Sequence, residues 1–126
     1  MTTTAIEQEL EKAYAARTKG NEGMARVCAR RAAGVAARIF LQQQGIPVTS
    51  ASAYDHLRTL SKTDGLPAPV QRAVAHLLAR VDENFQLPAG VDLLEEAKTL
   101  VKMLENLAFK PGHAQQPSPS GDKSPG

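Results

Sequence analysis

The sequence has a single cysteine, no tryptophan and few aromatic residues. Cys28 cannot form a disulfide within the chain, so nothing in the sequence indicates an oxidising compartment. Aromatic residues make up 4% of the chain, whereas 42% of it is hydrophobic, so alanine and leucine must supply most of the core. These two residues favour helices over strands. Because Cys28 falls among apolar residues with helical spacing, we interpret it as a buried packing residue rather than a nucleophile.

Long apolar runs are also missing. No stretch approaches the ~20 apolar residues that a membrane-spanning helix needs. The N-terminal stretch MTTTAIEQELEK is acidic and lacks the uninterrupted apolar segment of a signal peptide. We therefore expect a cytoplasmic protein that makes no membrane contact.

The familiar motifs of phosphate-binding loops and catalytic serines are absent, because the sequence contains no GxxxxGK[ST], GxGxxG or GxSxG. The three histidines, His56, His76 and His113, are scattered and have no spacing typical of metal ligands. We expect neither a metal site nor a cofactor. The acidic pair Glu95 and Glu96 falls at the expected start of a helix, where negative charge is stabilising, so we interpret it as structural.

Apolar residues recur with helical spacing in five segments, and no segment alternates like a strand. We expect helices at about Thr4–Lys19, Asn21–Gln44, Ala51–Lys62, from near Pro69 through Val81, and at Asp92–Lys110. The links between them are short, which is typical of antiparallel neighbours. The predicted fold is all-α, an antiparallel bundle of about five helices in residues 1–110. Residues 111–126 are rich in proline, glycine and serine and are predicted to form a disordered C-terminal tail.

The second segment, Asn21–Gln44, is predicted to be the central helix. Asn21 can cap its start, and Gly45 can adopt the left-handed turn that ends it. Its main apolar face is expected to consist of Met24, Val27, Cys28, Ala32, Val35, Ile39 and Phe40. A second face carries the small residues Ala29, Ala33, Gly34, Ala36 and Ala37. This second face would form a close contact with another helix of the bundle or a dimer seam, unless its alanines serve only as helix formers.

The central segment is also strongly basic. Its four arginines are Arg26, Arg30, Arg31 and Arg38. No acidic residue occurs between Glu22 and Asp55, so either bound anions or acids on other helices must balance this charge. The acidic candidates are Glu7, Glu9, Glu11 and Glu105. Both interpretations stay open, and the four arginines are the candidate ligand-binding residues for a nucleotide, RNA or acidic protein.

The candidate catalytic pair is Arg72 and His76. They lie one turn apart on the fourth expected helix and therefore share a side of it. A guanidinium beside an imidazole can stabilise negative charge and transfer a proton. The alternative interpretation is an ordinary solvated helix face.

Three stretches, GMARVCARRAAGVAARIFLQQQGIP, YDHLRTL and DLLEEAKTLVKML, together resemble the HEPN superfamily of small helical domains. The resemblance extends from about Gly20 to Leu107 and includes the alanine rhythm that closes in Phe40 and Leu41 before Gly45. It implies a helical bundle, frequent homodimerisation and association with nucleotides or RNA. It also implies a protein partner such as a nucleotidyltransferase.

The sequence departs from the pattern of the family's nucleases. In those enzymes four to six residues separate an arginine from a histidine, and a polar residue follows the arginine. Here three residues separate Arg72 from His76, and Ala73 follows the arginine. We therefore expect a HEPN-like non-catalytic binding or interaction module that associates with nucleotides or RNA through its basic helix. The alternatives are a metal-independent ribonuclease that uses Arg72 and His76, and a purely protein-binding structural adaptor.

Overall fold

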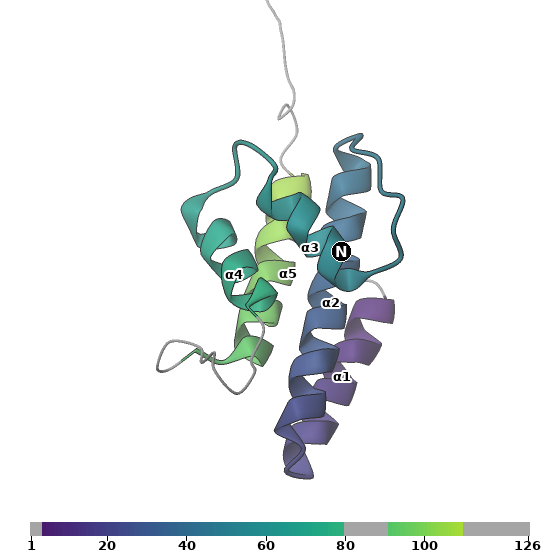
Figure 1. The fold of residues 1–126 in the computed structure, drawn as a ribbon, viewed down its shortest axis with the longest axis vertical. Coiled ribbons are helices and arrows are strands. Elements are labelled where there is room, and N and C mark those ends of the chain that lie inside the picture. Colours follow the sequence, from purple (N-terminus) through teal and green to yellow (C-terminus); the bar gives the residue numbers. More distant parts are fainter. Residues whose placement is uncertain (1–3, 80–90, 110–126) are drawn as a thin grey trace, which may run out of the picture.

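The computed structural model describes residues 4–79 and 91–109, and these residues form five helices (Figure 1). The helices are α1 (Thr4–Thr18), α2 (Glu22–Gln43), α3 (Ala53–Ser61), α4 (Ala68–Leu78) and α5 (Leu93–Phe109). No strand occurs within the described ranges. The predicted all-α bundle is confirmed. The expected continuation of the fourth helix through Val81 and the predicted tail at 111–126 lie outside the described residues.

Helix α2 forms the middle of the bundle and packs against α1, α3 and α5 (Figure 1). Helix α4 packs against α5 and α3. Asn21 caps α2 by accepting a hydrogen bond from the backbone N–H of Met24, as its position predicted. Gly20 and Gly45 have φ angles of +82° and +77°, so each supplies the left-handed turn that ends the preceding helix.

The face of α2 that is turned to the core differs from the predicted one. Its buried residues are Ala25, Cys28, Ala29, Ala32, Ala33, Gly34, Ala36, Ala37, Phe40 and Leu41. Met24 and Val27 were expected in the core, but they are 45% and 38% exposed, so this part of the prediction is wrong. Because three helices contact α2, small residues must face its neighbours, and longer side chains are displaced to the edges of these contacts.

The second, small-residue face of α2 is used inside one chain. Ala29, Ala33 and Ala37 are fully buried, and Gly34 lies directly against Ala53 at the start of α3. A Cβ atom on Gly34 would lie 2.6 Å from the Cα of Ala53 and would also overlap its Cβ. Of the interpretations open at the outset, the structure supports a close contact within the bundle, and this face is not available as a dimer seam.

The side chain of Arg17 connects the ends of three helices through hydrogen bonds. The guanidinium of Arg17, at the end of α1, donates to both carboxylate oxygens of Glu22 at 2.6 and 3.1 Å. It also donates to both oxygens of Asp92, each at 2.9 Å. Glu22 lies in the first turn of α2, and Asp92 accepts from the backbone N–H of Leu94 at the start of α5. The hydrogen bonds from Arg17 hold the pKa values of the Glu22 and Asp92 carboxyls below their ordinary range.

We expect the Arg17→Gln substitution to lower the free energy of unfolding at pH 7 by about 1 kcal/mol. A bidentate pair of a guanidinium and a carboxylate stabilises a fold more than an ordinary surface ion pair does. Solvent screening reduces this stabilisation here, because the group is partly exposed. Carboxyls with a lowered pKa in the folded state stabilise it above their unfolded pKa, and this stabilisation disappears as the pH falls through the folded pKa. Urea unfolding at pH 7 and below pH 4 should therefore show a large difference between wild type and variant at pH 7 and a smaller one in acid. Lys19→Gln, on the exposed end of the same hairpin, is the control. An equal difference at both pH values would contradict the ionic origin of the effect.

Candidate functional site

A groove with a volume of about 510 Å³ lies along α2, between α1 and the start of α3. This volume is in the range of small-molecule binding sites. The lining residues are Glu9, Val27, Arg30, Arg31, Gly34, Val35, Arg38, Ala51, Ser52, Ala53, Tyr54 and His56. Those from α2 recur every three or four residues and therefore form one side of that helix. Gly34 and Ala53 both line the groove and lie in close contact, so the shape of the groove depends on the approach of α2 to α3.

Three of the four predicted ligand-binding arginines meet in this groove, namely Arg30, Arg31 and Arg38. Arg26 is not among the lining residues, and its charge acts instead on Glu22 one turn earlier. Arg31 is exposed and Arg38 is half-buried. Neither of these two forms a hydrogen bond or ion pair with another residue in the described part of the chain. The groove thus presents two guanidinium groups that form no ion pair with a described acid.

Arg30 has a structural task at the edge of the groove. Its Nε atom donates to the carbonyl oxygen of Leu77 at 2.8 Å, and its Nη2 atom donates to that of Ala79 at 2.7 Å. These carbonyls belong to the C-terminal end of α4, where the last backbone acceptors lack partners within the helix. A cation there also opposes the negative end of the helix dipole. Arg30 therefore ties α4 to α2, a role that its sequence position did not reveal.

The α3 side of the groove is held by a short hydrogen-bond network. Ser52 caps α3 by accepting from the backbone N–H of Asp55, and Ser50 donates to the Asp55 carboxylate at 2.8 Å. His56 is only 5% exposed, and its Nε2 lies 2.7 Å from the carbonyl oxygen of Ser50. Because a carbonyl can only accept, this Nε2 carries the hydrogen. These bonds fix the link before α3, and residues at the start of that helix, Ser52 and Ala53, line the groove.

Glu9 is the one acidic residue among the described residues that line the groove. Its Oε2 atom is 3.9 Å from Nζ of Lys12. Its Oε1 atom is buried and has no hydrogen-bond partner among the described residues. From its place in the sequence, Glu9 was expected only as one possible counter-ion for the arginines, yet within the described residues no arginine forms an ion pair with it.

The candidate catalytic pair lies elsewhere, because neither Arg72 nor His76 lines the groove. The Nδ1 atom of His76 is 3.1 Å from Oε1 of Glu96 on α5, and both side chains are a little under one third exposed. Arg72 is exposed and forms no hydrogen bond or ion pair with a described residue. Glu96 thus supplies an orienting carboxylate that spacing along one helix could not reveal, since it comes from a different helix.

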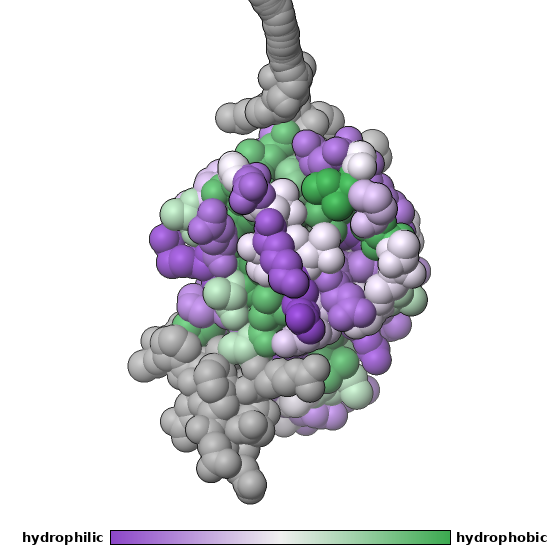
Figure 2. All heavy atoms as spheres, turned by 45° about the horizontal axis from the view of Figure 1, so that its top comes forward, coloured by the Kyte–Doolittle hydropathy of each residue, from purple (hydrophilic) through white to green (hydrophobic). Residues whose placement is uncertain are grey.

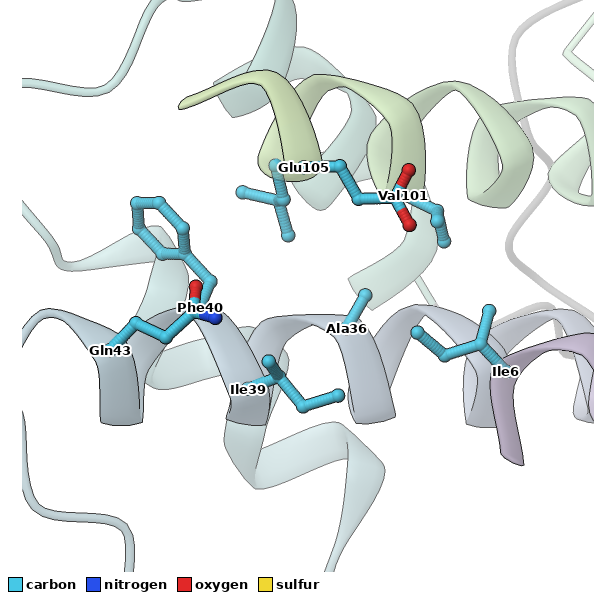
Figure 3. A pocket seen from close by; sticks show the side chains of 8 residues that line it. Ile6, Ala36, Ile39, Phe40, Gln43, Val101 and Glu105 are labelled. Atoms are coloured by element: carbon cyan, nitrogen blue, oxygen red, sulfur yellow. The ribbon is translucent and has the colours of Figure 1, made fainter. Parts of the chain in front are cut away.

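The other hollows are less suited to a charged ligand than the groove along α2. A cavity between α1, α2 and α5 has a volume of about 40 Å³, room for only a few water molecules. Figure 3 shows Phe40, Ile39 and Ala36 of α2 below it, with Val101 and Glu105 of α5 above. A hollow of about 290 Å³ at the end of the bundle is bordered by Gln44, Asp64 and Leu66, and the described part of its lining contains no basic residue. The arginine-lined groove is therefore the candidate site.

The surface carries no broad apolar area on the face drawn in Figure 2. Apolar patches there are small, and a diagonal band of hydrophilic side chains separates them. Small scattered apolar patches are ordinary for a protein surface and do not by themselves indicate a docking site. No helix in the described ranges has the length and apolar character needed to cross a membrane. The same residues contain no group of three or more side chains that could hold a metal ion.

Comparison of the chain with models of protein families, with curated proteins and with solved structures finds no match. The function of the groove must therefore be argued from its own residues.

Proposed function

We propose that the chain is a HEPN-like, non-catalytic binding module whose groove along α2 holds a phosphate-bearing ligand, a nucleotide or RNA. The observation that carries this proposal is that Arg31 and Arg38 line one groove and have no partner among the described residues. Positive charges that lie near one another destabilise a fold unless an anion neutralises them. A bound phosphate would do so.

The chemistry of the groove supports a phosphate over other anions. An arginine offers several N–H donors in a planar fork that matches two phosphate oxygens at once. Arg31 and Arg38 are seven residues apart, about two helical turns, so both lie on the same side of α2 roughly 10 Å apart along its axis. Their long side chains can enclose one phosphate or contact two successive ones. The positive end of α3 adds to the attraction.

We expect nucleotide or short RNA binding to weaken as salt is added, because phosphate contacts release counterions. The double substitution Arg31→Gln with Arg38→Gln should weaken binding by at least about tenfold, since hydrogen bonds to charged groups contribute more than neutral ones. Fluorescence anisotropy with a labelled RNA and a labelled nucleotide measures both effects. The matched control is Arg72→Gln, an exposed arginine outside the groove, for which we expect little change. Losses of equal size in the control, or binding that ignores salt, would place the site elsewhere.

The second candidate function is a metal-independent ribonuclease that uses Arg72 and His76. The His76–Glu96 contact favours it, because a carboxylate that holds one ring nitrogen can orient the imidazole. The spacing of Arg72 and His76 argues against it. The binding reactions therefore also serve as a test, since RNA should remain uncut without added metal. Cutting that is lost in His76→Ala while RNA binding is kept would establish the nuclease instead.

The proposal includes the partners that the resemblance implies. A homodimer would have to use a surface other than the small-residue face of α2, which is covered within one chain. A protein partner such as a nucleotidyltransferase and a cytoplasmic location also belong to the proposal. The purely protein-binding adaptor is the function to pursue if neither binding of phosphate compounds nor cleavage is found.

A further inference from the structure

An acidic side chain such as that of Glu9 is unexpected in a groove whose only role is to bind phosphate. Its carboxylate lowers the positive potential of the site, and its Oε1 atom is buried without a hydrogen-bond donor among the described residues. A buried acceptor without a donor destabilises the folded state. No groove arginine satisfies it through an ion pair, and Lys12 lies 3.9 Å from the other oxygen, beyond hydrogen-bond distance. The missing donor can come from a ligand.

The carboxylate can turn towards such a ligand at little expense. The terminal torsion of a glutamate is broad, so a partial rotation about it can present both oxygens to a ligand in the groove without a change of rotamer. The side chain as a whole is 20% exposed and lines the groove, so a ligand can reach it from there. An ionised carboxylate only accepts hydrogen bonds, which means that the ligand must present N–H or O–H groups to it.

Among the common nucleobases, guanine fits this requirement best. Its N1–H and N2–H₂ donors are adjacent on one edge and can bond both oxygens of a carboxylate. Adenine and cytosine offer an amino group beside a ring nitrogen that accepts, and uracil offers one N–H between two carbonyls. In these three bases an acceptor would meet the second carboxylate oxygen and repel it. Val27, Val35 and Tyr54 on the groove walls provide apolar and aromatic surface for the face of a base.

We infer that the groove selects guanine nucleotides, with Glu9 accepting the two donors of the base while Arg31 and Arg38 hold the phosphate. This inference rests on the proposed function, because it assigns the base-recognising residue of the same site. It also gives a reason for an acidic side chain among arginines, since the carboxylate discriminates between bases where the arginines cannot.

The test is calorimetric titration of the full chain with inorganic phosphate, GMP, IMP and AMP at low salt. We expect GMP to bind about tenfold more tightly than AMP, in the range that one bidentate base contact provides. IMP keeps the N1–H donor but lacks the amino group, so it should fall between them. In Glu9→Gln the ratio of GMP to AMP affinity should approach one, while phosphate binds at least as well as before. The variant loses no hydrogen bond within the described residues, so its thermal unfolding should match that of the wild type.

Glu11→Gln is the matched control, because Glu11 is exposed on α1 and does not line the groove. It should leave the ratio of GMP to AMP affinity unchanged. Equal binding of GMP and AMP by a wild type that binds phosphate, or a preference for GMP that survives in Glu9→Gln, would overturn the inference and leave the phosphate site standing. Failure to bind phosphate or any nucleotide would instead overturn the proposed function and the inference with it.

Discussion

Replacing Gly34 with alanine is expected to lower the free energy of unfolding by about 1–3 kcal/mol. Alanine is the better helix former by about 1 kcal/mol, so propensity alone predicts a gain. The new methyl group would lie 2.6 Å from the Cα of Ala53, and backbone cannot move aside as a flexible side chain does. The start of α3 would have to shift. Because Gly34 and Ala53 both line the groove, the same variant should also bind nucleotide or RNA more weakly.

Gly23→Ala is the matched control for this experiment. Gly23 is in the first turn of the same helix, and a Cβ atom there would lie 3.8 Å from Oδ1 of Asn21, which is an ordinary van der Waals contact. We expect this variant to be equally stable or more stable by up to about 1 kcal/mol. Urea unfolding of both variants separates sterics from propensity. A stabilised Gly34→Ala variant would show that α2 and α3 do not approach as closely as the structure has them.

Leu100→Ala is expected to lower the free energy of unfolding by about 2–5 kcal/mol, because it leaves a cavity where a fully buried side chain packed. Leu100 lies on the inward face of α5 with Leu93, Leu94, Ala97, Val101 and Leu104. The exposed neighbour Thr99, changed to alanine, should alter stability by less than about 0.5 kcal/mol. Thermal or urea unfolding measures both. A change below about 1 kcal/mol for Leu100→Ala would mean that α5 turns a different face to the core.

The sequence was sufficient to predict the helices but not which side of α2 faces inward. Helical spacing, the cap at Asn21 and the turn at Gly45 are local features, and local chemistry decides them. On a helix with several apolar faces, large apolar side chains such as Met24 and Val27 suggest that their own face is the one turned to the core. Which residues of α2 are buried depends instead on the number of helices that pack against it. That number depends on contacts between segments far apart in the sequence.

The candidate site was predictable to a similar extent. The basic segment identified Arg31 and Arg38, because a run without acids stands out in any sequence. The different task of Arg30 depends on carbonyls at the end of α4, and the contact between His76 and Glu96 joins two helices. The presence of Glu9 on the groove wall follows from the antiparallel pairing of α1 with α2. Such relations arise only when the helices are packed together.

The guanidinium of Arg17 has consequences for the order in which the chain assembles. One of its partners, Glu22, is five residues away, whereas the other, Asp92, is seventy-five residues away. During synthesis from the N-terminus, α1 and α2 can pair and form the first contact while Asp92 has not yet been made. Until α5 is made, two of the four hydrogen bonds of Arg17 are therefore made to water, and the helical hairpin presents a charged donor that Asp92 can bind later. Arg17 thus first binds Glu22 at the neighbouring turn and later binds Asp92, next to the helix that is most distant in the sequence.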